Sequence, residues 1–200
     1  MKKILVLASF MMLSVAGWAQ HEVGKVTIQP KVGLNIANYR TSESTDPRVA
    51  LAAGVELEYQ VTNIFSLSAG MLYSMQGAKS SEYASGYNVK TTAKTDYLNI
   101  PIMANFYVAK GLAVKFGIQP AFNVTANYEV STAGVSVSGS LSDLGVDVNT
   151  FDFSIPVGLS YEFSNVVIDA RYNFGLTKII SNSDDKNSVF QFTLGYKFEL

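Results

Sequence analysis

The sequence predicts an all-β protein: an eight-stranded antiparallel, up-and-down transmembrane β-barrel that follows an N-terminal signal peptide. Three observations lead to this fold class. Apolar and polar residues alternate with a period of two over eight segments, which is typical of strands with two unlike faces. The connections between the segments are alternately short and long. The chain also begins with a basic end and an apolar stretch, as secretory signals do.

Residues 1–19 are the predicted signal peptide. Lys2 and Lys3 precede an apolar stretch over residues 4–15, and the small residues Gly17 and Ala19 precede the predicted cleavage site. Residues 20–200 then form one β-barrel domain. Losing two of the 15 basic residues leaves 13 against 16 acidic ones, a net charge of −3, so we expect no nucleic-acid partner. The absence of cysteine excludes disulfides and a lipoprotein anchor.

The first four strands are predicted over residues 27–39, 50–60, 64–77 and 95–108. In the first two, Ile, Val and Leu alternate with small, amide and charged residues. The third has the most regular pattern, with an apolar series at the odd positions 65–75 and mainly Ser and Gly between them. The fourth alternates less regularly around Pro101. Each is long enough to cross a bilayer, which takes about 9–11 residues of a tilted strand.

The last four strands are predicted over residues 112–128, 151–163, 166–177 and 188–198. The final one shows the alternation clearly, because Phe190, Phe192 and Leu194 are separated by Gln191 and Thr193. Tight turns are expected at 61–63, 109–111 and 164–165. Long polar loops are expected at 40–49, 78–94, 129–150 and 178–187. In outer-membrane barrels the short turns are periplasmic, so both termini are predicted to lie in the periplasm.

The two faces of the predicted strands differ in chemistry. The apolar face includes every phenylalanine that follows Phe10. An eight-stranded barrel has an interior just wide enough for a filling of side chains, so this bulky set is predicted to face outer-membrane lipid. Six aromatic residues that flank the short turns would form an interfacial girdle: Tyr59, Phe65, Phe106, Tyr161, Phe163 and Phe198.

Charged residues of balanced sign fall on the opposite, inner face. Unpaired buried charges are costly, so we interpret the set as a salt-bridged plug in the periplasmic half of the lumen. A selectivity ring or proton path is the alternative. The predicted lumen network comprises Lys31, Glu56, Glu58, Lys115, Glu162, Asp169, Arg171 and Lys197.

Four prolines fall inside the predicted strands: Pro30, Pro101, Pro120 and Pro156. Each lacks the backbone N–H that a sheet ladder uses. We therefore expect β-bulges at these positions, or a strand start in the case of Pro30.

Several motifs resemble the small outer-membrane β-barrel family typified by PorT. The segment from Asp96 to Pro101, with the sequence DYLNIP, resembles a strand of that family, and so do 117–120, 152–158, 161–163, 171–176 and 195–198. The resemblance covers nearly the whole chain after the signal peptide. It implies an outer-membrane β-barrel and, through PorT, an accessory role in envelope protein secretion. Prolines in the fourth, fifth and sixth strands recur in that family. The chain ends two residues beyond the expected terminal aromatic, Phe198.

The sequence gives no indication of an enzyme, a cofactor or a metal site. The single histidine after the signal peptide, His21, lies two residues from the predicted cleavage site, before the first strand. A histidine general base at the outer rim is therefore not expected, and no phosphate loop or metal-ligand cluster is present. A Ser–Lys or carboxylate pair is the remaining enzymatic alternative.

Three functions remain open at this stage. The first is a structural or adhesive barrel whose extracellular loops bind a partner. Tyrosines in the loops could supply the contacts, namely Tyr83, Tyr87, Tyr97 and Tyr128. The second is the secretion accessory, with a periplasmic partner, and the third is a narrow porin. The barrel assembly machinery is an expected partner during biogenesis in all three.

Overall fold

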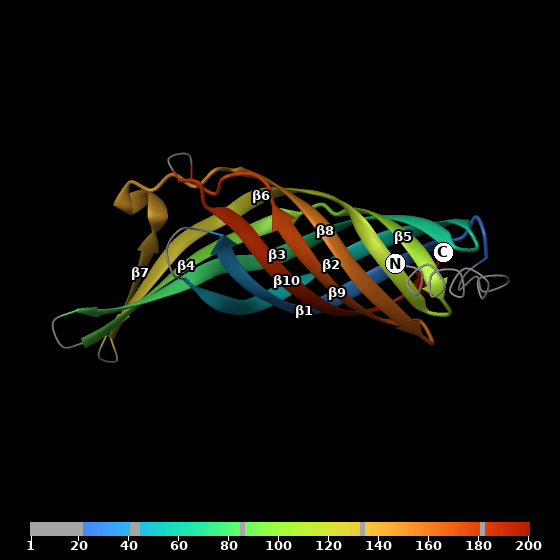
Figure 1. The fold of residues 1–200 in the computed structure, drawn as a ribbon, viewed down its shortest axis with the longest axis horizontal. Coiled ribbons are helices and arrows are strands. Elements are labelled where there is room, and N and C mark those ends of the chain that lie inside the picture. The colour runs from blue at the N-terminus through green and yellow to red at the C-terminus, as the bar shows by residue number, and fades with distance from the viewer. Residues whose placement is uncertain (1–21, 41–44, 85–86, 133–134, 181–182) are drawn as a thin grey trace, which may run out of the picture.

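The computed structural model describes residues 22–40, 45–84, 87–132, 135–180 and 183–200. The predicted signal peptide and His21 lie outside these residues. Figure 1 shows tilted strands wrapped into an elongated barrel, with part of the sheet protruding from one end. The elements are β1 (Val26–Arg40), β2 (Asp46–Thr62), β3 (Phe65–Ala84), β4 (Tyr87–Asn99), β5 (Ile102–Ala109), β6 (Leu112–Thr132), β7 (Val135–Ser140), the 3₁₀ helix η1 (Leu141–Leu144), β8 (Phe151–Phe163), β9 (Val166–Gly175), β10 (Lys186–Tyr196) and β11 (Phe198–Glu199).

The strands form a closed antiparallel ring with eight positions, which confirms the predicted fold class. Successive strands are neighbours, and β1 pairs with both β2 and β10, which closes the sheet. β4 and β5 together fill one position between β3 and β6. β10 and β11 both pair with β1 and fill another. Within the described residues, no helix is both long and apolar enough to cross a bilayer.

Pro30 lies inside β1 and is neither a strand start nor a bulge, so both expectations are wrong. The β1–β2 ladder runs in one register from Val26 to Ala37, and Pro30 is paired with Val55. On its other side, Pro30 faces the interruption between β10 and β11, where the register is the same before and after the gap. The missing donor therefore falls at a gap in one ladder, while the other ladder remains continuous.

The other three prolines are accommodated in the same way, without the predicted bulges. Pro101 lies in the break between β4 and β5, and Pro120 is opposite that break, where its carbonyl accepts from the Ile100 N–H at 2.9 Å. β4 and β5 keep one register against β6 across the break. Pro156 is paired with Asn173 on β9 and faces an interruption in the β6–β8 ladder.

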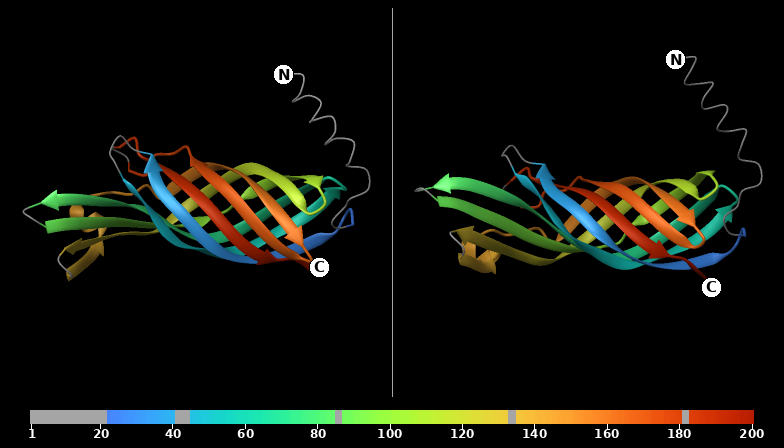
Figure 2. Two further views of the ribbon diagram at one scale, coloured as in Figure 1. Left: turned by 60° about the horizontal axis from the view of Figure 1, so that its bottom comes forward. Right: turned by 90° about the horizontal axis from the view of Figure 1, so that it is seen from below.

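Segment 78–94 is largely strand, and segment 129–150 contains the end of β6 and all of β7 before η1 and a loop, so the prediction of long loops is wrong for the first segment and for the second up to Ser140. β3 and β4 remain paired out to Ala84 and Tyr87, and β6 turns back into β7. β3, β4, β6 and β7 make a four-stranded sheet that protrudes past the ends of the other strands, as Figure 2 shows. We call the part formed by residues 79–84, 87–94, 127–132 and 135–140 the protruding sheet. Backbone pairing satisfies its polar groups, although its side chains lack the apolar pattern of the wall.

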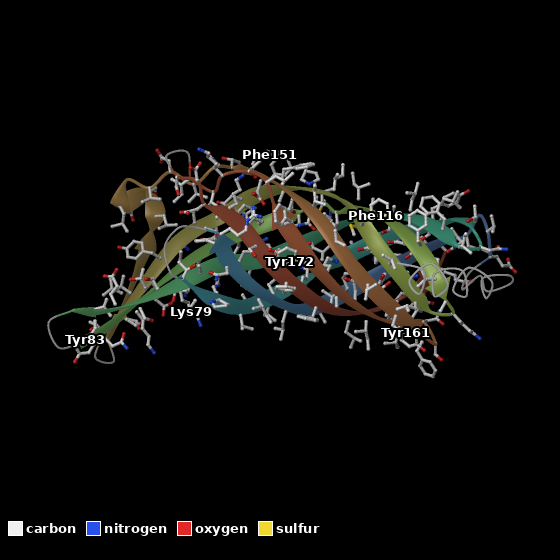
Figure 3. The ribbon with its side chains drawn as sticks, in the orientation of Figure 1. Lys79, Tyr83, Phe116, Phe151, Tyr161 and Tyr172 are labelled. Carbon is white, nitrogen blue, oxygen red and sulfur yellow. The ribbon has the colours of Figure 1, made fainter. Side chains whose placement is uncertain are left out.

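The wall has the predicted orientation of its faces. Bulky apolar side chains project outward, and Figure 3 shows Phe116, Phe151, Tyr161 and Tyr172 pointing away from the barrel. On β5, Ile102 and Phe106 are exposed, whereas Met103 and Asn105 between them are buried. The interior is therefore polar or tightly filled, and the exterior is suited to hydrocarbon.

Candidate functional site

A cluster of five charged side chains occupies the middle of the barrel interior. β1 supplies Lys31, β2 supplies Glu56, β6 supplies Lys115, and β9 supplies Asp169 and Arg171. All five residues are buried. They converge because each has inward parity on its strand, and the strands meet around a narrow lumen. We call this set the central cluster.

Two carboxylates connect the three cations of the central cluster. Glu56 accepts from the ammonium groups of Lys31 at 2.8 Å and Lys115 at 2.9 Å, and from the Arg171 guanidinium at 3.3 Å. Asp169 accepts from Lys115 at 3.0 Å and from Arg171 Nε at 2.8 Å. Each charge thus has an opposite charge within hydrogen-bond reach, which buried ions require.

A second cluster lies nearer the short turns. Lys197 is 3.0 Å from the carboxylate of Glu58 and 2.8 Å from that of Glu162. Ser66 donates to Glu58 at 2.6 Å, and the Tyr107 hydroxyl donates to the same oxygen of Glu58. We call these five residues the turn-end cluster. With one cation and two carboxylates, its charge balances the excess cation of the central cluster.

Sequence reasoning did not include Tyr107 in the lumen network. The signal was available, because Tyr107 has the same inward parity as Met103 and Asn105 on β5. Its ring also lies beside Lys197, whose ammonium is 5.8 Å from the ring centroid.

The interior between the central cluster and the long-loop end is filled by amides and bulky side chains. Asn35 donates to Ser74 at 2.9 Å and accepts from Gln191 at 2.9 Å. Gln119 donates to Ser154 at 3.1 Å. The largest fully buried side chains include Tyr97, Leu72 and Met103. The described interior is thus packed with side chains from several strands on both sides of the central cluster.

The four tyrosines proposed as loop contacts have different positions. Tyr83 lies near the tip of the protruding sheet, as Figure 3 shows. It belongs to the outer face and is 79% exposed. Tyr128 belongs to the opposite face, where its ring covers Gly139. The side chain of Tyr87 lies outside the described residues. Tyr97 is 0% exposed, so its prediction as a loop contact is wrong. β4 begins ten residues earlier than Tyr97, which places this residue in the wall with inward parity.

The protruding sheet has a polar outer face with a groove of about 380 Å³. Cross-strand pairing aligns Lys79 with Thr92, and Ser81 with Lys90. The groove is lined by Asp46, Pro47, Lys79, Ser81, Lys90, Thr92 and Ser131. Its hydroxyls and ammonium groups can bind polar or anionic groups. No group of three or more His, Cys, Asp or Glu side chains among the described residues could hold a metal ion.

Solved structures with the same fold are outer-membrane barrels. The attachment invasion locus protein Ail of Yersinia pestis, solved in complex with the heparin analogue sucrose octasulfate, is 14% identical with a TM-score of 0.53; the match covers 88% of this chain and 100% of Ail. Neisserial surface protein A is 14% identical with a TM-score of 0.48, covering 86% of this chain and 97% of that one. At these identities the similarity concerns the fold alone.

A family-level comparison agrees with the fold. No curated protein matches this chain. The outer membrane protein beta-barrel domain family matches residues 18–181, which extends from before β1 to beyond β9. The finer resemblance to PorT remains a prediction. The wall with its apolar exterior, the filled charged interior and the family match lead to one conclusion: the chain belongs to the outer membrane protein beta-barrel domain family and is a β-barrel of the bacterial outer membrane.

Proposed function

We propose that this protein is a non-enzymatic outer-membrane anchor that displays a partner-binding sheet at the cell surface. The protruding sheet is the observation that carries the proposal. Four strands extend past the rim and present a polar groove with Lys79, Lys90 and several hydroxyls. A barrel that served only as a membrane plug would not need an extended, hydrogen-bonded platform beyond the bilayer.

The proposal places the long connections outside the cell and both termini in the periplasm. Short turns are periplasmic in outer-membrane barrels, and this barrel has turns of two residues between β2 and β3, between β5 and β6, and between β8 and β9. All three lie at the end opposite to the protruding sheet (Figures 1 and 2).

In this proposal the lumen clusters are structural. Ion pairs join cations and carboxylates from β1, β2, β6 and β9 across the interior. Balanced pairs favour a plug over a channel, because a pore would require hydrated charges of one sign along a passage. We therefore propose that the barrel does not conduct ions. The purified protein should show negligible steady conductance in planar bilayers, and stable ion-selective steps would favour the porin alternative.

Surface labelling tests the orientation. Gly139 is unsuitable as a tag site, because it lies within β7 under the Tyr128 ring. Suitable tag sites are Ser85, which follows the last residue of β3, and the connection between Thr132 and Val135. They should be labelled on intact cells, with a tag after Leu200 as the periplasmic control. If only the Leu200 tag is labelled on intact cells, the topology is the inverse of the proposed one and the proposal is refuted.

A deletion strain separates the partner-binding role from the secretion accessory. Loss of attachment or of partner binding, with normal export, is expected here. Loss of exported proteins from the medium would favour the accessory role, which rests on the resemblance to PorT alone. The deletion is to be complemented with the full chain and with a chain whose groove carries Lys79→Gln and Lys90→Gln. Attachment should return with the full chain and not with the chain that carries the two Lys→Gln changes.

A further inference from the structure

Two cations face each other across neighbouring strands at the long-loop end of the wall. Arg40 ends β1 and Lys186 begins β10, and the two residues are direct cross-strand partners. Side chains of opposed residues in an antiparallel pair start about 5 Å apart, and like charges there repel. Both side chains are half-buried. No carboxylate among the described residues lies within ion-pair distance of either cation, although Lys186 acts through its charge on Asp184, which is itself paired with Lys178 at 2.7 Å.

The Arg40 guanidinium is held in place on the outer surface of the barrel. Its carbon lies 3.8 Å from the centroid of the Phe174 ring, and Nη2 donates to the Gly175 carbonyl at 2.7 Å. Phe174 projects outward and is exposed. Lys186 has the same outward parity on β10 as Phe190, which is also exposed. The two cations therefore point toward the surroundings of the barrel and not into its lumen.

The position of the pair matches the depth of lipid headgroups. Directly below it, on the side of the lipid-facing wall, the Tyr172 ring packs against Phe190 at 4.6 Å, and Tyr172 shares a hydrogen bond with Ser188 at 2.8 Å. Aromatic residues of this kind mark the boundary between hydrocarbon and headgroups. Cations immediately above such a girdle lie where phosphate groups stand.

We propose that Arg40 and Lys186 bind a phosphate of a lipid headgroup, namely a lipid A phosphate in the outer leaflet. The phosphate would sit between the two cations and remove their repulsion. Arg40 would donate from the planar guanidinium edge that does not contact Gly175, and Lys186 would act as a point charge. The assignment to the outer leaflet rests on the orientation given in the proposed function. The binding of a phosphate by the two cations does not depend on that orientation.

Native mass spectrometry of the full mature protein in zwitterionic detergent tests the site. The probes are bis-phosphorylated lipid A and the same lipid with both phosphates removed. The wild-type protein should retain the first and not the second. Replacing both cations, Arg40→Gln with Lys186→Gln, should weaken binding about twenty-five-fold, since one surface cation changes the affinity for anionic lipid about fivefold. The matched control is Lys25→Gln with Lys110→Gln at the short-turn end, which removes the same charge and should have little effect.

Three further outcomes would contradict the phosphate site, and a fourth would contradict only the orientation. Equal binding of the dephosphorylated lipid to the wild-type protein would overturn it, whether or not any variant folds. Equal loss in the two double variants would reduce the site to general charge attraction. Displacement of lipid A by inorganic phosphate at the same concentration would indicate a site for a free anion. If the tags at Ser85 and 132–135 are not labelled on intact cells while phosphate-dependent binding persists, the proposed orientation is wrong and the phosphate site at Arg40 and Lys186 is retained.

Discussion

The barrel wall and the protruding sheet are made from the same strands, yet their faces have opposite character. In the wall, apolar residues such as Met71 and Ile102 point outward and charged or amide residues point inward. In the protruding sheet, the outer face carries Lys79, Lys90 and Lys94, while the continuation of the inner face carries Val135 and Val137. The difference follows from the medium that surrounds each region. Lipid selects an apolar exterior for the wall, and beyond the membrane water selects a polar one.

A bulge on β6 contributes to this exchange of faces. Asp96 pairs with Thr125 and Tyr97 with Asn123, so Val124 is an extra residue on β6. The alternation of inward and outward positions on β6 is therefore reversed above the bulge. Tyr128 can then lie on the inner face together with Gly139, whereas Glu129 is on the outer face beside Lys94.

The largest expected effect is in the wall. Arg171→Ala removes one of three cations that hold Glu56 and Asp169, and leaves those carboxylates short of charge in a buried site. Breaking such a pair costs about 3–5 kcal/mol. Urea unfolding of the barrel in lipid vesicles measures this. Lys178→Ala is the control, because it removes an exposed ion pair with Asp184, and exposed pairs contribute little to stability. Equal losses for the two variants would refute a buried network.

A smaller loss is expected in the turn-end cluster. Glu58→Gln keeps the shape of the side chain and leaves Lys197 paired with Glu162. We expect a loss of about 1–3 kcal/mol, mainly from the weakened hydrogen bonds with Ser66 and Tyr107. The same unfolding assay applies, with Tyr107→Phe as the partner in a double-mutant cycle. Additive losses for the two changes would show that the Glu58–Tyr107 contact contributes nothing.

An effect confined to the protruding sheet is expected from Gly139→Ala. A Cβ atom at this position would lie 2.8 Å from the Tyr128 hydroxyl and 3.0 Å from ring atoms, so the ring must move. The cost is about 1 kcal/mol, and it should speed hydrogen exchange in β6 and β7 without changing the unfolding midpoint of the barrel. Ser138→Ala, on the outer face of the same strand, is the control. A shifted barrel midpoint would show that the two regions unfold together.

The smallest effect concerns one carboxyl group outside the membrane. The Lys94 side chain donates to Glu129 and lowers the pKa of that carboxyl from its ordinary value, with the charge of Lys94 adding to the hydrogen bond. A lowered pKa means that the pair is intact at neutral pH and is lost only as the pH falls through the acidic range. Lys94→Gln should raise the pKa of Glu129 in an NMR titration, and Lys110→Gln should not. An unchanged Glu129 titration would contradict the pairing.

Strand number, closure and the polarity of the faces were all predictable because lipid imposes a strict period-two pattern. The protruding sheet was not, since its residues face water on both sides and lose the apolar series that marks a strand. A weaker signal remained in the β-branched residues Val135 and Val137, which alternate with Ser136 and Ser138. The prolines were misjudged because the expectation of bulges overlooked that a ladder can be interrupted on one side and keep its register.

The lumen residues could be selected from parity, but not their partners. Which carboxylate meets which cation depends on the stagger between strands, and a shift of two residues changes the depth of a side chain by about 7 Å. Glu56 and Glu58 illustrate this dependence. They are neighbouring inward positions on β2, two residues apart, yet they belong to different clusters. The prediction for Tyr97 was wrong for a related reason. The fourth strand was predicted to begin at residue 95, near the rim, whereas β4 begins at Tyr87 and Tyr97 lies deeper in the barrel.

The continuity of β3 and β6 has a mechanical consequence. These strands have 20 and 21 residues, and each belongs to both the wall and the protruding sheet. At about 3.3 Å per residue, each is a rod of roughly 65 Å without an intervening linker. A load applied at the tip is carried along the strands and resisted as shear by many backbone hydrogen bonds at once. The wall and the protruding sheet are therefore one continuous mechanical unit, and in the proposed function the pull of a bound partner would be shared by the whole wall of the barrel.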